Sequence, residues 1–151
     1  MPDSGLTPKP VRLVHLSDIH FGAEDIEALT AVEQFISHLK PDGIIIAGDI
    51  TQTGKRSEFE AGRAWFDKLG FPVISAPGNH DTPVFHIPAR VVAPFDRYER
   101  YMEGMDIVGQ IRNFGEGQVR VSAINSARGF QGRMNWADGV IDLGDLDAAL
   151  D

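Results

Sequence analysis

The sequence predicts an α/β fold in which a parallel sheet carries helices on its faces. Three short apolar runs, at residues 11–17, 43–48 and 71–76, alternate with two stretches of helical periodicity, and this alternation builds parallel sheets. The chain has 151 residues, of which 42% are apolar, enough for the core of one domain. Residues 1–10 are polar and rich in proline, so we expect a flexible arm there and the N-terminal part of a single domain over residues 11–151.

The first predicted strand, at residues 11–17, is apolar enough to be buried on both faces of the sheet. His15 lies in its middle, where we expect a hydrogen-bonded core histidine. Apolar residues then recur at three- and four-residue steps over residues 25–39, which predicts a helix that Pro41 ends. A second buried strand is expected to follow at residues 43–48.

The second predicted helix begins at a capping box. Ser57 is the expected N-cap, and Glu60, three residues later, is its expected acidic partner. Gly70 is expected to end this helix. The third apolar run, residues 71–76, then completes the set of strands in the predicted sheet.

The second half of the chain predicts a further helix and a second sheet. Residues 105–125 have the pattern of two antiparallel strands joined around Gly-Glu-Gly at 115–117, and residues 143–150 begin an amphipathic helix. Residues 88–103 carry a stripe of apolar side chains at helical spacing, which we interpret as core packing. The members of this stripe are Val91, Val92, Phe95, Tyr98 and Met102.

Charge and composition exclude several classes of function. The net charge is −8, with 22 acidic and 14 basic residues, and the basic residues are scattered, so no nucleic-acid-binding or anionic-membrane surface is expected. The chain has no cysteine, which excludes disulfide scaffolds, zinc knuckles and thiolate catalysis. No stretch has the length of a membrane span or the pattern of a signal peptide, so we expect a cytoplasmic protein.

Polar side chains follow each of the three predicted strands. Asp18, Asp49 and Asn79 are 31 and 30 residues apart (49 − 18 and 79 − 49), and the carboxyl ends of parallel strands meet at one edge, where ligand sites of α/β sheets form. Two carboxylates crowded there repel each other unless a cation is present. With His20 and His80 beside them, the sequence predicts a metal site at this edge.

The ligand types narrow the choice of metal. Imidazole, carboxylate and amide ligands without sulfur suit manganese, iron, zinc or cobalt. A central carboxylate can bridge two divalent ions, and such a pair activates a water for phosphoryl displacement. Asp49 is the candidate for that bridge, because it ends the middle one of the three runs.

Plainer readings of the same residues stay open. Aspartate is common in the turns that follow strands, so Asp18 and Asp49 could be ordinary turn residues. The sequence Asp81-Thr82-Pro83 is also typical of a turn. His80 could likewise be a simple loop residue. Farther on, His86 and Arg90 lie where either a substrate loop or a solvated loop is expected.

The motifs "SDIH" (17–20), "GDI" (48–50) and "GNHD" (78–81) occur in this order at the three strand ends. The sequence thereby resembles the calcineurin-like metallophosphoesterase superfamily, and in particular its bacterial cyclic-nucleotide-phosphodiesterase-like branch. The resemblance implies an α/β/β/α sandwich and a site with two divalent metal ions. In that site Asp18 and His20 would be ligands of the first ion.

The resemblance also implies roles for the other motif residues. Asp49 would bridge the two ions and Asn79 would bind the second one. His80 would stabilise or protonate the leaving oxygen, and Asp81 would orient the imidazole of His80. The implied function is hydrolysis of a small phosphoester, with phosphodiesters and cyclic nucleotides among the candidates, by a hydroxide that the two metals activate.

One feature of the family is missing. Its fold normally supplies further histidines, including a Gly-His-x-His motif, from its C-terminal half, whereas the last histidine here is His86. We therefore expect the chain to be C-terminally truncated, with an incomplete second sheet through which it self-associates. The alternative function is that of a non-catalytic or truncated module of this fold that acts as an interaction surface.

Overall fold

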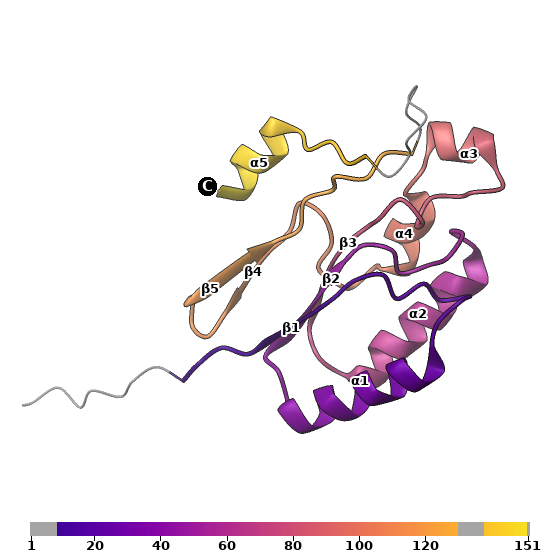
Figure 1. Cartoon of the computed structure of the whole chain (residues 1–151). Helices are drawn as coiled ribbons and strands as arrows, with labels where there is room; N and C mark the ends of the chain where they lie inside the picture. Colours follow the sequence, from indigo (N-terminus) through magenta and orange to yellow (C-terminus); the bar gives the residue numbers. More distant parts are fainter. Residues whose placement is uncertain (1–8, 130–137, 151) are drawn as a thin grey trace, which may run out of the picture.

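The computed structural model describes residues 9–129 and 138–150 (Figure 1). None of the helices within these ranges is both long and apolar enough to cross a membrane. The residues of the expected arm, apart from its last two, lie outside the described ranges, so the division into arm and domain stays a prediction. The elements are β1 (Leu13–Leu16), α1 (Ile26–Leu39), β2 (Gly43–Ala47), α2 (Arg56–Leu69), β3 (Val73–Ala76), α3 (Ile87–Val92), α4 (Asp96–Tyr101), β4 (Ile111–Phe114), β5 (Val119–Ser122) and α5 (Leu143–Leu150).

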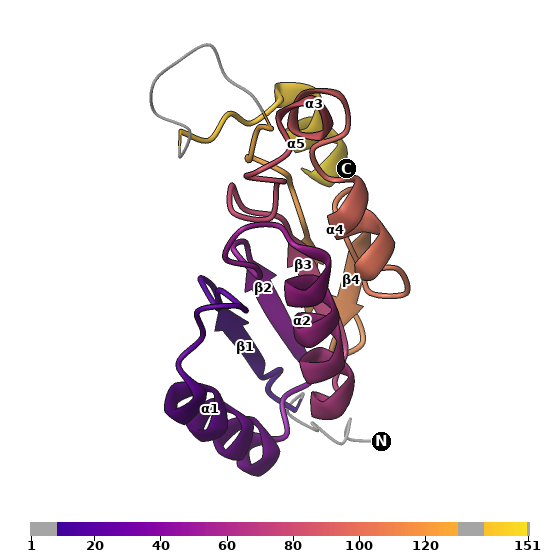
Figure 2. The ribbon, with the colours of Figure 1, turned by 90° about the vertical axis from the view of Figure 1, so that its right-hand side faces the viewer.

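Strands β1, β2 and β3 form a parallel sheet in that order, which confirms the predicted alternation. Helices α1 and α2 lie on one face of this sheet, and the antiparallel hairpin β4–β5 lies on the other (Figures 1 and 2). Each face has its own core. Ile44 and Ile46 of β2 are buried among residues of α1 and α2 on the helical face, whereas Ile74 of β3 packs with Phe114 of β4 on the hairpin face.

Strand β1 is less buried than its sequence predicts. Val14 is buried on the helical face, but His15 is exposed, so the expectation of a core histidine and of a strand buried on both faces is wrong. Leu13 packs against Phe114, and His15 shares its face because side chains two residues apart point the same way. The hairpin covers the start of β1 only, which leaves His15 and Ala47, both exposed, uncovered.

Helix α2 starts at Arg56, and its N-cap is Lys55 instead of the predicted Ser57. The reason is that Glu58, instead of Glu60, accepts hydrogen bonds from the backbone in front of the helix. Its end agrees with the prediction, because Gly70 caps the helix with a φ of 71°.

The helix expected over residues 88–103 is two short helices, α3 and α4. Pro94 lies between them, and proline cannot donate the hydrogen bond that a continuous helix needs. Because the first half turns away from the core, Val91 and Val92 are 53% and 83% exposed, contrary to the prediction. Tyr98 of α4 is buried as expected, and its hydroxyl lies 2.8 Å from Oγ of Ser75 in β3.

The second sheet is present as the hairpin predicted around residues 115–117, and α5 lies at the predicted position. Contact between the two sheets depends on a glycine. The Cα of Gly43 in β2 faces the ring of Phe114 so closely that a Cβ there would lie 2.5 Å from Cε1. The two sheets can approach at this point because the residue has no side chain.

We therefore expect the Gly43→Ala variant to lose roughly 1–3 kcal/mol of unfolding free energy in urea denaturation, since the ring must leave its position. The loss should shrink in a Phe114→Leu background, where the side chain is smaller. An equal loss in both backgrounds would show that the Gly43–Phe114 contact does not limit the packing of the sheets.

Candidate metal centre

Three of the residues singled out by sequence meet at the carboxyl edge of the parallel sheet. Asp18 and His20 lie in the loop after β1, and Asp49 lies in the loop after β2; one ligand atom of each falls within 4.8 Å of the others. Nε2 of His20 is 3.8 Å from Oδ1 of Asp18. The arrangement brings two carboxylates and an imidazole to one point, as the strand spacing suggests.

The backbone of these three residues is left-handed. The φ angles are 54° for Asp18, 54° for His20 and 52° for Asp49, a conformation that costs energy for residues other than glycine. Only two other non-glycine residues in the described ranges share it. Strained backbone of this kind concentrates at functional sites, so the three angles independently mark this cluster.

Hydrogen bonds between the two loops hold the strained backbone in place. The Asp18 N–H donates to the Gly48 carbonyl at 3.3 Å, and the His20 N–H donates to the Asp49 carbonyl at 3.0 Å. Phe21 adds a bond to the Ile50 carbonyl at 2.8 Å. The pairing of β1 with β2 thus continues past the ends of both strands and carries the side chains with it.

Asp49 is also fixed from the side of β3. Its Oδ1 accepts a hydrogen bond from the His80 N–H at 2.9 Å. Gly78 lies so close that a Cβ on it would be 2.5 Å from the Asp49 nitrogen and would overlap Oδ1. Asn79 follows directly, and it lines with Asp49 a cavity of about 260 Å³ that Ser126 and Asp138 also line.

His80 is oriented by the loop after β2. Its ring meets that of His20 edge to face, with the centroids 4.7 Å apart, and its Nδ1 lies 2.8 Å from the Gln52 carbonyl oxygen. A carbonyl only accepts, so Nδ1 carries the proton and Nε2 is the nitrogen left for other partners.

Asp81 does not orient the imidazole of His80, so that part of the prediction is wrong. The carboxylate is fully buried and accepts hydrogen bonds from the backbone N–H groups of Gly78, Ile50 and Thr51 at 2.9, 3.3 and 2.8 Å. Oγ1 of Thr51 lies 3.0 Å away as well. Burial raises the pKa of Asp81, although these hydrogen bonds favour its charged form.

Arg90, which the sequence left between a substrate loop and a solvated loop, is in neither position. Its side chain is buried at 5% exposure, and Nε donates to the Gly129 carbonyl at 2.6 Å. It therefore ties α3 to the segment that follows β5. The neighbouring His86 is exposed and accepts a hydrogen bond from the Ala89 N–H at 3.1 Å, which caps α3.

The donor set fits a divalent cation. Asp18 is exposed, and His20 and Asp49 are half-buried. Nδ1 of His20 is buried and has no hydrogen-bond partner among the described residues, an unmet requirement that a coordinated cation would satisfy. Two carboxylates and an imidazole without sulfur suit the borderline metals named above.

Comparison with known proteins agrees with the motifs. The sequence profile of the calcineurin-like phosphoesterase family matches residues 11–139. The chain belongs to this family. Membership confirms the family that the three motifs predicted, and together with the parallel sheet and the second sheet it confirms the fold class.

Two curated relatives are phosphodiesterases by name. The chain is 30% identical over 80 residues to the glycerophosphodiester phosphodiesterase GpdQ of Enterobacter lignolyticus, a match that covers 46% of this chain and 29% of that protein. It is 29% identical over 80 residues to a probable cyclic nucleotide phosphodiesterase of a Synechococcus species, covering 47% and 31%. The match therefore spans less than a third of either relative.

A solved structure superposes on this member of the calcineurin-like phosphoesterase family with a TM-score of 0.56. The two sequences are 10% identical, and the superposition covers 94% of this chain and 63% of the other. It supports the fold alone.

The closeness of Gly78 to Asp49 leads to a prediction about metal binding. In the Gly78→Ala variant the new methyl group must displace the Asp49 carboxylate, so we expect Mn²⁺ affinity in calorimetry to fall at least tenfold, about 1.4 kcal/mol. Gly144→Ala is the control, since the one atom that a Cβ there would approach is a carboxylate oxygen at the end of the Asp142 side chain. Equal affinity of both variants and the parent chain would contradict the assignment of Asp49 as a ligand.

We expect the buried Asp81 carboxylate to stabilise the folded chain. Replacing it by asparagine puts an amide donor among N–H groups that need an acceptor, so Asp81→Asn should lose about 2–3 kcal/mol of unfolding free energy. Asp67→Asn, which removes an exposed ion pair with Arg63, should change stability by less than about 1 kcal/mol. Denaturant titration of the two variants measures both, and matching losses would refute this role of Asp81.

Proposed function

We propose that the protein is a metal-dependent phosphodiesterase with two divalent ions at the carboxyl edge of its parallel sheet. The observation that carries the proposal is the convergence of Asp18, His20 and Asp49 within 4.8 Å. In this proposal Asp18 and His20 bind the first ion, Asp49 bridges, and Asn79 binds the second. Family membership and the names of the two relatives support it.

The bound ions would polarise the phosphoryl oxygens and lower the pKa of a water molecule. The protein's own part is to hold ligands and move a proton. His80 donates Nδ1–H to Gln52, and the imidazolium form also carries a proton on Nε2. That proton would pass to the leaving oxygen, which is the role of a general acid.

The proposed substrates are small phosphodiesters. The cavity of about 260 Å³ beside Asp49 and Asn79 has the size of a small ligand group, and it is walled largely by short side chains such as Ala47 and Ala76. The names of the relatives point to glycerophosphodiesters and cyclic nucleotides, so these are the first substrates to screen.

The test is Mn²⁺-dependent hydrolysis of bis(p-nitrophenyl) phosphate by the chain, beside Asp49→Ala and the control Asp67→Ala. We expect Asp49→Ala to lose roughly a hundredfold or more in kcat and to bind Mn²⁺ weakly in calorimetry, while Asp67→Ala retains both. Hydrolysis that Asp49→Ala leaves unchanged would overturn the proposal. Mn²⁺ binding by the parent chain without hydrolysis would also overturn it and favour a non-catalytic module.

A further inference from the structure

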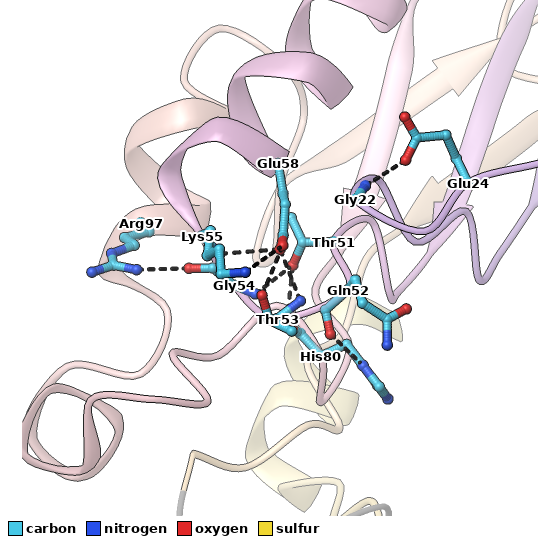
Figure 3. Close-up of polar contacts among 10 residues, drawn as sticks. All are labelled: Gly22, Glu24, Thr51, Gln52, Thr53, Gly54, Lys55, Glu58, His80 and Arg97. Atoms are coloured by element: carbon cyan, nitrogen blue, oxygen red, sulfur yellow. Dashed lines mark hydrogen bonds and ion pairs between the residues drawn. The ribbon is translucent and has the colours of Figure 1, made fainter. Parts of the chain in front are cut away.

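Glu58, in the first turn of α2, is an acidic side chain that the proposed chemistry does not use. Its side chain is 6% exposed, and its carboxylate accepts hydrogen bonds from the Thr53 N–H at 2.8 Å, from the Thr53 hydroxyl at 2.7 Å and from the Lys55 N–H at 3.2 Å (Figure 3). The ammonium group of Lys55 adds an ion pair at 3.8 Å. All these partners belong to the loop that connects β2 to α2.

The carboxylate is held in its charged form. Burial raises the pKa of Glu58, but the hydrogen bonds from Thr53 and Lys55 and the positive charge of Lys55 outweigh it and hold the pKa below its usual range. A buried charge is expensive unless its partners are fixed. The loop and Glu58 therefore order each other.

Glu58 and His80 are connected through a single peptide group. The Thr53 N–H that Glu58 binds and the Gln52 carbonyl that binds Nδ1 of His80 are the two ends of the Gln52–Thr53 peptide bond. That bond is trans, since the described chain has no cis peptide, and its atoms lie in one plane. Fixing the direction of the N–H consequently fixes the direction of the carbonyl.

The negative charge of Glu58 also polarises the Gln52–Thr53 peptide group. A carboxylate on the N–H polarises the amide and makes its carbonyl a stronger acceptor, as in other hydrogen-bond chains. The chain runs from Glu58 through the Gln52–Thr53 peptide to the imidazole of His80 (Figure 3). Its effect is to favour the tautomer with the proton on Nδ1 and to leave Nε2 facing other partners.

Neighbouring residues keep Glu58 and the loop from adopting another arrangement. A Cβ on Gly22, in the loop that also carries His20, would lie 2.9 Å from Oε1 of Glu58, so that loop packs directly on the carboxylate. On the other side, Nη1 of Arg97 donates to the Gly54 carbonyl at 2.7 Å (Figure 3). The carboxylate is thus enclosed between the two loops that supply the candidate ligands.

We propose that Glu58 is a positioning residue for His80, which sets the tautomer and direction of the imidazole through the Gln52–Thr53 peptide. Its consequence for catalysis rests on the proposed function, whereas its consequence for the imidazole does not. Glu60, two residues farther along the same helix, is exposed and contacts Arg56 at 2.8 Å and the Tyr101 hydroxyl at 3.5 Å instead of the loop, so it gives a matched control.

The first experiment reads the tautomer of His80 by long-range ¹H–¹⁵N NMR of the metal-free chain, labelled at histidine and held at pH 8, where an ordinary imidazole is neutral. The His80→Asn variant assigns the signal. We expect Nδ1–H in the parent chain and in Glu60→Gln. Glu58→Gln should give a mixture of tautomers, because its amide group cannot accept all three hydrogen bonds.

The parent chain alone can refute the proposal, since an Nε2–H tautomer of His80 there would overturn it whether or not any variant folds. An unchanged Nδ1–H signal in folded Glu58→Gln would overturn it as well. Glu58→Asp is the second variant: it keeps the charge but is too short to reach the Thr53 N–H, so it should resemble Glu58→Gln.

Kinetics with bis(p-nitrophenyl) phosphate separate positioning from general damage. We expect Glu58→Gln to lower kcat roughly tenfold to a hundredfold, with KM and the calorimetric Mn²⁺ affinity within twofold of the parent chain. A fall in Mn²⁺ affinity that parallels the fall in kcat would assign Glu58 a merely structural role. If the parent chain hydrolyses nothing, the proposed function fails, and the tautomer measurement still decides the role of Glu58.

Discussion

The backbone pairing of β1 with β2 beyond their last residues is the interaction on which the candidate site depends. The bonds from Asp18 to Gly48 and from His20 to Asp49 keep two loops parallel where a sheet would normally have ended. They compensate for the left-handed backbone of Asp18, His20 and Asp49. Without them each loop could relax to an unstrained conformation, and the ligand atoms would separate.

The third loop joins this pair through contacts of a different kind. Gly78 packs on Asp49 without a side chain between them, and the His80 N–H binds the Asp49 carboxylate. Asp81 then collects N–H groups from the loops after β2 and β3 into one buried carboxylate. The result is a site whose three loops are linked by hydrogen bonds and close packing. The strands determine only where each loop begins and in which direction it leaves the sheet.

Much of this arrangement could be predicted from sequence because it follows from strand order. Parallel strands of similar length deliver their next residues to one edge, so the positions of Asp18, Asp49 and Asn79 required only the apolar runs to be recognised. The order of the three motifs along the chain likewise indicated the family, which the family profile confirms. Prediction failed where side chains choose among several nearby partners.

Asp81 and Glu58 show why that choice is invisible in the sequence. Asp81 is next to His80 in the chain, yet its carboxylate accepts hydrogen bonds from the backbone of the loop after β2. The imidazole of His80 donates its Nδ1–H to a carbonyl of that loop instead. Glu58 and Glu60 look equally suited to begin a helix, and only the folded loop distinguishes them. His15 failed for another reason, because its exposure depends on how far a distant hairpin extends over the sheet.

Burial divides the acidic residues around the edge into two kinds. Asp81 and Glu58 are enclosed, and backbone and side-chain donors occupy their oxygen atoms, so they have little capacity left for an ion. Asp18 is exposed and Asp49 is half-buried, with a single donor to Asp49 among the hydrogen bonds of the described residues and none to Asp18. A carboxylate binds a cation through free lone pairs. The same residue type therefore serves as scaffold where the loops enclose it and as candidate ligand where they leave it open.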